Sequence, residues 1–299
     1  MSKRVVRVAA ITAKDKLRRI LDHGLENGIC FSAEHADKCT LIENGIDKIE
    51  SWIGRPAPIQ YSADLSRYVL DAGVKLLKER RADLIYLTLS DFVQHKHAPG
   101  EPEANEFLAV IDERLGEMAD LGAVVAVTGD HGMSDKSRGD GTPCVLFLQE
   151  ELESQFDRGS VRVICPITDP FVKHHSALGS FVRIYTRNGN DVETMLEYCE
   201  KFPEVELALT GSAAAWRFEM PLDLESDIVV VAAPNAVIGS SKAEHDLTQL
   251  DGQRLRSHGG LLEQRVPLIL SKPISNREAA VKREWRNFDI FDLALNWSS

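Results

Sequence analysis

The stretch AVVAVTGDHGMSD, residues 123–135, decides how the rest of the chain is interpreted. Its apolar residues 123–127 predict a strand that is buried on both faces, as is typical of a parallel sheet. Asp130 and His131 stand side by side just after this run. In an open α/β sheet, ligands bind beyond the carboxyl ends of the strands. A carboxylate and an imidazole there are suitable ligands for a divalent metal ion.

Length and charge restrict the classes of protein to consider. The chain has 299 residues, which suits one large domain or a core with an insertion. Its net charge of −11, with no basic stripe to offset it, argues against nucleic-acid binding. An anionic small substrate is still compatible with this charge, because bound metal ions can invert the local field.

Cysteine usage and hydropathy predict a cytoplasmic protein with no membrane partner. The five cysteines are scattered and form no CxxC pair, so neither disulfides nor a cysteine zinc site is expected. Reduced and mostly buried thiols are the expectation. The apolar run near the N-terminus is too short for a secretory signal, and no apolar segment of 18 residues occurs.

The first elements predict a strand followed by a helix. Residues 5–11 form a β-branched strand, and Thr12 is a candidate cap for the next helix. That helix closes on Gly24 and carries three apolar residues at helical spacing, namely Leu17, Ile20 and Leu21.

Lys14 and Lys16 lie at the turn between this strand and helix. Solvated lysines in a first helical turn are the simpler interpretation. Cations at this end oppose the helix dipole, however, which favours an anionic ligand nearby. Both interpretations stay open from the residues alone.

A second strand is expected over residues 83–89, after a helix over 64–81, and it leads into SDFVQH. If one helical turn follows that strand, Asp91 and His95 lie on the same face and form a two-ligand arrangement. An N-terminal cap and a surface histidine explain this pair equally well. His97 lies off that face and is expected to be solvent-exposed.

The order of elements predicts an α/β fold with a doubly wound, mostly parallel sheet. A helix over 103–121 completes the order β–α–β–α–β. Both pairs of acid and histidine then reach the same edge of the sheet. Convergence from two separate strands is harder to obtain by chance than either pair alone.

From Gly139 the sequence changes to several short runs with strand character. Residues 139–248 predict an inserted α+β cap, and residues 1–138 and 249–299 the metal-binding core. Strands of the cap are expected over 161–168, 180–186 and 205–210, and a helix over 191–201. His174 and His175 could reach a substrate, although loop histidines are more often polar surface. The apolar residues 227–233 are a candidate to return to the main sheet.

The last marker is LRSHGG, residues 255–260, in which two glycines follow His258. Glycines let the backbone approach a ligand closely, although an ordinary glycine-rich turn without a ligand explains these residues as well. A short buried strand follows at residues 267–270, and residues 277–299 predict a closing helix.

The three segments SDFVQH, GDHGM and RSHGG together resemble the alkaline phosphatase superfamily of metal-dependent phospho- and phosphonohydrolases. Their order and spacing match across nearly the whole chain. Within the superfamily, TAKDKLRR and HDLTQLDGQRLRSHGG are similar to segments of the phosphonoacetate hydrolases.

This resemblance implies an alkaline phosphatase-like core, a two-metal site, usually zinc, and cleavage of the C–P bond of phosphonoacetate to acetate and phosphate. It assigns Asp91, His95 and His258 to one metal and Asp130 and His131 to the second. Lys14 and Lys16 would bind the carboxylate of an organophosphonate substrate and support the charge that develops on the departing group.

The chain departs from the family pattern at its start. The family has a further metal-ligating aspartate and a threonine nucleophile upstream of TAKDKLRR, where this chain has only eleven residues. No catalytic nucleophile is therefore identified, and a truncated chain is expected, as a fragment, a misassigned start or a decayed copy.

Two other functions remain open, and so does the oligomeric state. One is a phosphodiesterase or nucleotide pyrophosphatase of the same superfamily, which shares the metal motifs but not the paired lysines. The other is a non-catalytic metal-binding remnant. A homodimer is left open.

Overall fold

The computed structural model describes residues 6–166, 178–187, 191–250 and 252–298. The chain divides into two compact units, which we describe separately. The first comprises Met1–Val93, Pro99–Thr128 and Pro267–Ser299, and the second Gln94–Ala98 and Gly129–Val266. The predicted cap boundaries at 139 and 248 lie inside the second unit, and the cap itself stays a prediction. No helix in the described ranges combines the length and apolar character needed to cross a bilayer.

The first unit is built from helices around short strands. Its strands are β1 (Val8–Thr12), β2 (Ile29–Ser32), β3 (Leu84–Thr88), β4 (Ala126–Thr128) and β13 (Leu268–Leu270). Its helices are α1 (Asp15–Leu21), α2 (Leu41–Asn44), α3 (Ile49–Ile53), α4 (Asp64–Lys78), α6 (Pro102–Asp120), α10 (Arg277–Lys282) and α11 (Ile290–Asn296), and α5 (Phe92–Lys96) runs from this unit into the second.

A parallel sheet of order β2-β1-β3 organises the first unit. Strand β1 lies between its two partners, and the side chains of Ala9 and Ile11 are fully buried. The structure confirms the predicted α/β class with parallel strands. Strand β3 lies where the apolar run over 83–89 predicts a buried strand, but every residue of β3 is only half-buried, which corrects the predicted burial.

Strand β4 differs from its prediction in two respects. It begins at Ala126 rather than at residue 123, and its three residues are half-buried. Its hydrogen-bonded partner in the described structure is β13, which runs antiparallel to it. A strand paired along one edge is less covered than one inside a parallel sheet, so the expected burial on both faces was wrong.

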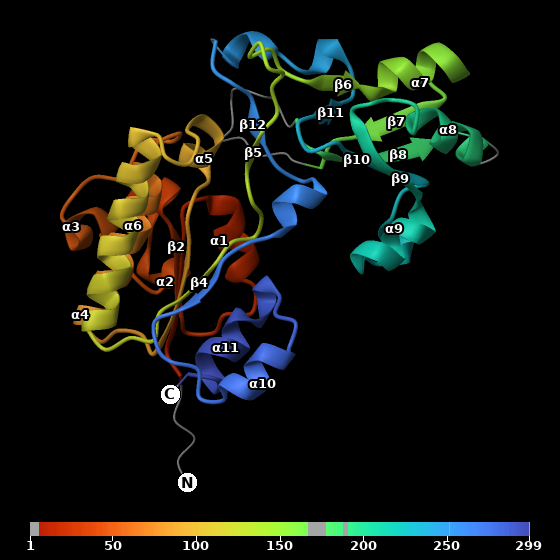
Figure 1. Cartoon of the computed structure of the whole chain (residues 1–299). Coiled ribbons are helices and arrows are strands. Elements are labelled where there is room, and N and C mark those ends of the chain that lie inside the picture. The colour runs from red at the N-terminus through yellow and green to blue at the C-terminus, as the bar shows by residue number, and fades with distance from the viewer. Residues whose placement is uncertain (1–5, 167–177, 188–190, 251, 299) are drawn as a thin grey trace. The chain divides into compact units, whose positions relative to one another are not determined.

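Helices α4 and α6 pack side by side (Figure 1) and confirm the helices predicted over 64–81 and 103–121. Their shared core contains Leu70, Val74 and Met118. Gly73 permits this packing, because a Cβ atom there would lie 2.6 Å from Leu87 Cδ1 and 2.9 Å from Met118 Cε. The close approach of α4 to β3 and α6 therefore depends on a glycine.

Helix α1 is shorter and more exposed than the sequence predicted. It ends at Leu21, before Gly24, and Leu17 and Ile20 are 36% and 62% exposed. Thr12 does not cap it: the N-cap residue is Lys14, and the Thr12 hydroxyl donates to the Lys14 carbonyl oxygen at 2.8 Å. Helical spacing alone does not show whether an apolar face has a neighbour to cover it.

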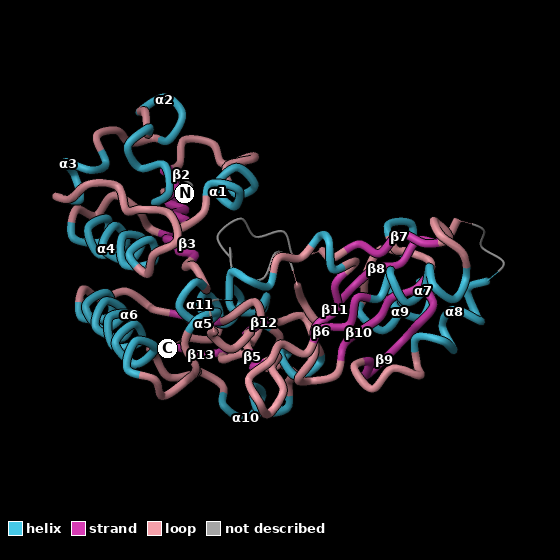
Figure 2. Tube along the Cα trace, turned by 90° about the horizontal axis from the view of Figure 1, so that it is seen from above, coloured by secondary structure: helices cyan, strands magenta, loops and turns pink. Residues whose placement is uncertain are grey.

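The second unit contains all the other strands of the described residues. Its elements are β5 (Ser134–Asp135), β6 (Val145–Phe147), α7 (Leu148–Phe156), β7 (Val161–Ile164), β8 (Phe181–Thr186), α8 (Val192–Cys199), β9 (Val205–Thr210), α9 (Gly211–Phe218), β10 (Ile228–Ala232), β11 (Val237–Gly239) and β12 (Arg256–Ser257). The four-stranded antiparallel sheet has the order β7-β8-β10-β9 (Figure 2).

The structure confirms the strands predicted over 180–186 and 205–210 and the helix over 191–201, whereas β7 ends at Ile164, before the predicted limit of 168. It also corrects one prediction. Strand β10 does not return to the β1 sheet, because it pairs with β8 and β9. Its five residues are all buried, since it has a strand on each side. Helices α7 and α8 contact β7 and β9 and share the largest apolar core of the unit.

The end of the chain forms two helices instead of the single one predicted over 277–299. A break after Lys282 separates α10 from α11. Arg283 lies at this break and bonds Asp289 and Asp292, each at 2.7 Å. The chain thus turns where an ion-pair cluster stabilises it.

All five cysteines are free thiols, as expected. Three of them are buried, and burial raises the pKa of the Cys199 thiol to about 12. A thiol with such a pKa stays protonated at neutral pH and is a poor nucleophile.

Candidate metal centre and lysine turn

His95 is the most deeply buried of the predicted ligands. It lies on α5 and is 1% exposed. Its Nδ1 is 3.0 Å from the carbonyl oxygen of Arg256. Because a carbonyl can only accept, Nδ1 carries a proton, and in the neutral ring Nε2 is then the nitrogen with the lone pair. A backbone acceptor that orients one imidazole nitrogen is common behind metal-binding histidines.

The loops after β4 and β12 bring His131 and His258 to the same place. Their rings stack with centroids 3.6 Å apart and an interplanar angle of 6°. The His95 ring lies 5.6 Å from that of His258. His131 Nδ1 donates to the Gly132 carbonyl oxygen at 2.9 Å, so Nε2 is the nitrogen that bears the lone pair in the neutral ring. Four of the five predicted metal ligands therefore lie in the second unit, and the three histidines among them gather.

Asp130 lies at the exposed side of this cluster. Its side chain is 90% exposed, and its Oδ2 is 3.7 Å from His131 Nε2. Its Oδ1 accepts the backbone N–H of His131 at 3.1 Å. Asp130 and His131, which are adjacent in the sequence, thus also have their side chains close in space. The imidazole is mostly covered and the carboxylate contacts solvent.

Asp91 belongs to the first unit, where it forms an ion pair with a predicted substrate-binding residue. Lys14 Nζ is 3.3 Å from Asp91 Oδ1, and both side chains are mostly covered. Helix α5 provides the predicted single helical turn between Asp91 and His95. Lys16, by contrast, is exposed. The two lysines therefore have different surroundings, which the spacing of the letters does not indicate.

The turn from β1 into α1, which carries Lys14 and Lys16 and is called the lysine turn below, is fixed by acidic residues that the sequence analysis missed. Glu34 Oε2 accepts the backbone N–H of Asp15 at 2.8 Å. Burial raises the pKa of the Asp15 carboxyl, but hydrogen bonds from Arg18 and Arg19 outweigh it and lower the pKa overall. Glu34 is nineteen residues from Asp15, and no local sequence signal connects them.

Arg256 is a second residue that the sequence analysis passed over. Its Nε donates to the Gln94 carbonyl oxygen at 2.8 Å, while its own carbonyl accepts from His95. The side chain is 7% exposed. Its position two residues before His258 in RSHGG was the available signal.

The remaining histidines are placed differently. His97 is half-buried rather than solvent-exposed, which corrects the prediction. His174 and His175 lie outside the described residues.

The residues of the histidine cluster fit a zinc ion by their donor chemistry. Imidazole nitrogens and carboxylate oxygens are the ligands that zinc uses beside thiolates. Both His95 and His131 have Nδ1 occupied by a carbonyl, which orients Nε2 as the ligand atom. No cysteine belongs to the predicted set, which agrees with the scattered thiols.

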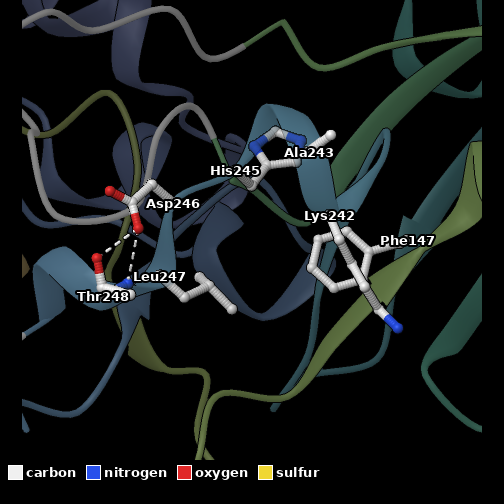
Figure 3. A pocket seen from close by; sticks show the side chains of 7 residues that line it. All are labelled: Phe147, Lys242, Ala243, His245, Asp246, Leu247 and Thr248. Atoms are coloured by element: carbon white, nitrogen blue, oxygen red, sulfur yellow. Dashed lines mark hydrogen bonds between the residues drawn. The ribbon is translucent and has the colours of Figure 1, made fainter.

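A cavity of about 500 Å³ in the second unit is lined by none of the predicted site residues (Figure 3). Its walls include Phe147, Lys242 and His245, and Asp246 accepts hydrogen bonds from Thr248 beside it. His245 Nε2 accepts the Ser240 backbone N–H at 3.0 Å. These contacts explain His245 as a buried, hydrogen-bonded residue of the fold.

Comparison with known proteins gives consistent matches. Residues 33–260 match the family described as type I phosphodiesterase / nucleotide pyrophosphatase. Crystal structures of phosphonoacetate hydrolase from Sinorhizobium meliloti, in complex with phosphonoformate and with phosphonoacetate, are 46% identical with a TM-score of 0.89. The match covers 98% of this chain and 71% of that chain.

Two further matches are more limited. A phosphonoacetate hydrolase from Penicillium oxalicum is 62% identical over 29 residues, which are 10% of this chain and 40% of that protein. Murine ectonucleotide pyrophosphatase / phosphodiesterase 5 is 18% identical over 72% of this chain and 55% of its own, with a TM-score of 0.50. The murine protein shares the fold.

Proposed function

Because this chain belongs to the type I phosphodiesterase / nucleotide pyrophosphatase family, and within it to the phosphonoacetate hydrolases, we propose that it hydrolyses the carbon–phosphorus bond of phosphonoacetate to acetate and phosphate. The observation that carries the proposal is the identity of 46% over 98% of the chain. A small phosphonate is the substrate class, and a negatively charged protein needs local cations to bind it.

The proposal assigns two zinc ions to five residues. Asp91, His95 and His258 bind one ion, and Asp130 and His131 contribute to the other. The covered imidazoles of the second unit support this assignment, because their orientation by backbone carbonyls leaves Nε2 as the ligand atom. Zinc in such a site would polarise a phosphoryl oxygen and stabilise the charge that develops on it.

The lysine turn supplies the cations for the rest of the substrate. Cleavage of the carbon–phosphorus bond expels a carbanion, which is a poor leaving group unless it is delocalised. In phosphonoacetate the carbanion is the enolate of acetate, and its charge lies on the carboxylate oxygens. Lys14 and Lys16 bind that carboxylate and stabilise the developing charge, as fixed cations do at an oxyanion.

Lys14 carries more of this task than Lys16. It contacts Asp91 at 3.3 Å and is mostly covered, so its ammonium group is held in place before substrate arrives. Lys16 is exposed and loses more side-chain freedom when it binds.

A phosphodiesterase is the second candidate function, favoured by the family model that matches residues 33–260. Such an enzyme needs the metal ligands but not the paired lysines. The two candidates therefore differ in what the lysine turn does.

The test loads the chain with zinc, measures the zinc content, and follows acetate and phosphate release from phosphonoacetate beside cleavage of an aryl phosphodiester. Release of acetate and phosphate from phosphonoacetate would support the proposal. Cleavage of the diester alone would support the phosphodiesterase, and bound zinc with neither activity would support a non-catalytic metal-binding protein.

A further inference from the structure

Glu263 connects the two loops that carry His131 and His258. It lies in a short 3-10 turn, Leu261–Gln264, and is 3% exposed. Its carbonyl oxygen accepts the N–H of Gly132 at 2.6 Å. Its carboxylate oxygen Oε2 accepts the N–H of Gly260 at 2.7 Å. One residue thus contacts the neighbour of His131 and the second residue after His258.

The other carboxylate oxygen reaches further along the His131 loop. Glu263 Oε1 accepts the Ser134 hydroxyl and lies 3.0 Å from Lys136 Nζ. Lys136 is fully buried and also donates to the Pro234 carbonyl oxygen at 2.8 Å. Burial lowers the pKa of Lys136, although Glu263 opposes the change. A charged pair without access to water is held in one geometry only if its remaining bonds are satisfied, as they are here.

Two glycines leave the room that Glu263 occupies. A Cβ atom on Gly132 would lie 3.3 Å from the Glu263 backbone, and one on Gly260 would lie 2.8 Å from Glu263 Oε2. The pairing of β5 with β12 also joins the two histidine loops, because Ser134 of β5 lies opposite Ser257 of β12, the residue directly before His258. The backbones on both sides of the stacked imidazoles are therefore fixed to each other through Glu263.

We propose that Glu263, paired with the buried Lys136, is a positioning residue that holds His131 and His258 in the geometry for binding metal. Glu263 itself is not a ligand, because its oxygens are occupied by Gly260, Ser134 and Lys136. The inference rests on the proposed metal-binding role of the histidines. It concerns their arrangement and not the identity of the substrate.

The test compares Glu263→Gln with Glu225→Gln in the full chain. A glutamine at 263 places an amide N–H against the N–H of Gly260 or the ammonium group of Lys136. One of the hydrogen bonds that join the two loops through residue 263 is then lost. Glu225 is a matched control, because it is also a buried glutamate of the second unit paired with an arginine, Arg183 at 2.7 Å. Zinc affinity is measured by competition with a chromophoric chelator, thermal unfolding is followed in parallel, and cobalt absorption spectra report the ligand geometry.

The expected result is that Glu263→Gln weakens zinc binding by about 10- to 100-fold, as changes behind metal ligands do. Its cobalt spectrum changes, whereas Glu225→Gln lowers the melting temperature without changing zinc affinity or the spectrum. If Glu263→Gln fails to fold, Ser134→Ala carries the test, with a loss in zinc affinity of about fivefold from one missing hydrogen bond.

Three results would overturn the inference: unchanged zinc affinity in the Glu263 or Ser134 variant that folds, an equal loss in Glu225→Gln, or no zinc uptake by the unmodified chain. The proposed function fails separately. A chain that binds zinc through Glu263-supported histidines but leaves phosphonoacetate intact would refute the activity and keep the positioning role.

Discussion

The histidine cluster of the second unit and the lysine turn of the first hold their functional groups by different means. His95 and His131 are oriented by peptide carbonyls, and the loops of His131 and His258 are joined through the buried Glu263. Lys14 is held by an ion pair to Asp91, and its turn by Glu34. The proposed histidine ligands therefore depend on buried backbone geometry, whereas Lys14 and its turn depend on the charges of acidic side chains.

The largest effect is expected from removing an imidazole of the cluster. We expect His258→Ala to weaken zinc binding by more than about 100-fold, which exceeds the usual effect of residues behind the ligands. Zinc content after dialysis measures this, and His23→Ala, an exposed histidine of the first unit, is the control. Unchanged zinc content in His258→Ala would remove the metal assignment.

The next effect concerns the lysine turn. We expect Lys14→Ala to lower kcat/KM for phosphonoacetate by about 100-fold, since one fixed charge at a developing oxyanion is lost. Lys16→Ala should lower it less, because that side chain is exposed. In the absence of turnover, the Kd for phosphonoacetate provides the same comparison. An equal loss on an aryl phosphodiester would contradict the assigned role, because it would show that Lys14 does not act specifically on the carboxylate of phosphonoacetate.

The carboxylate of Glu225, in the second unit, makes part of the stability depend on pH. Burial raises the pKa of Glu225, but hydrogen bonds from Arg183 outweigh it and the pKa lies below its ordinary value of 4.5. The ionised form is therefore favoured by folding, and its contribution is complete above pH 4.5 and lost as the pH falls through the lower, folded-state value.

We accordingly expect Glu225→Gln to lower the free energy of unfolding by about 2 kcal/mol at pH 7, the usual value for a hydrogen bond to a charged group. The difference from the unmodified chain should shrink as the pH drops below 4.5. Urea unfolding at several pH values tests this, and a difference independent of pH would contradict the assigned cause.

The smallest effect is expected at the start of α1. Glu34→Ala removes the acceptor for the Asp15 N–H and should cost about 1 kcal/mol of stability, as the loss of a helix cap does. Glu34 Oε1 also accepts from Gln60 at 2.8 Å, so Gln60→Ala is the matched control for that second bond. Equal melting temperatures for the two variants would show that the α1 contact adds nothing.

Local patterns predicted individual elements well where a single segment contains the information. Helices α4 and α6 follow the predicted ranges, because amphipathic spacing persists over 15 and 19 residues. The β-branched runs of β8 and β10 were also recognised as strands. The partner of each strand was not predictable in the same way, because the partner is a segment far away in the sequence. Strand β10 pairs with β8 and β9, and β4 pairs with β13 in antiparallel orientation.

The candidate site divides along the same line. Residue types and their spacing pointed to Asp91, His95, Asp130, His131 and His258 as candidates near strand ends. The resemblance to the alkaline phosphatase superfamily then assigned these residues and the two lysines to one site. Glu34, Lys136 and Glu263 were invisible to this reasoning, since each acts through a contact between segments that are remote in the chain. Arg256 stands inside the RSHGG segment, but its contact with Gln94 was equally remote.

The sequence by itself determined the α/β class, the long helices and the residue types able to bind zinc, because these depend on periodicity and side-chain chemistry. Only the tertiary structure decided that Lys14 is covered while Lys16 is exposed, and that one buried glutamate joins the loops of two histidines. Burial and hydrogen-bond partners arise from segments that meet after folding, and no local pattern records which segments those are.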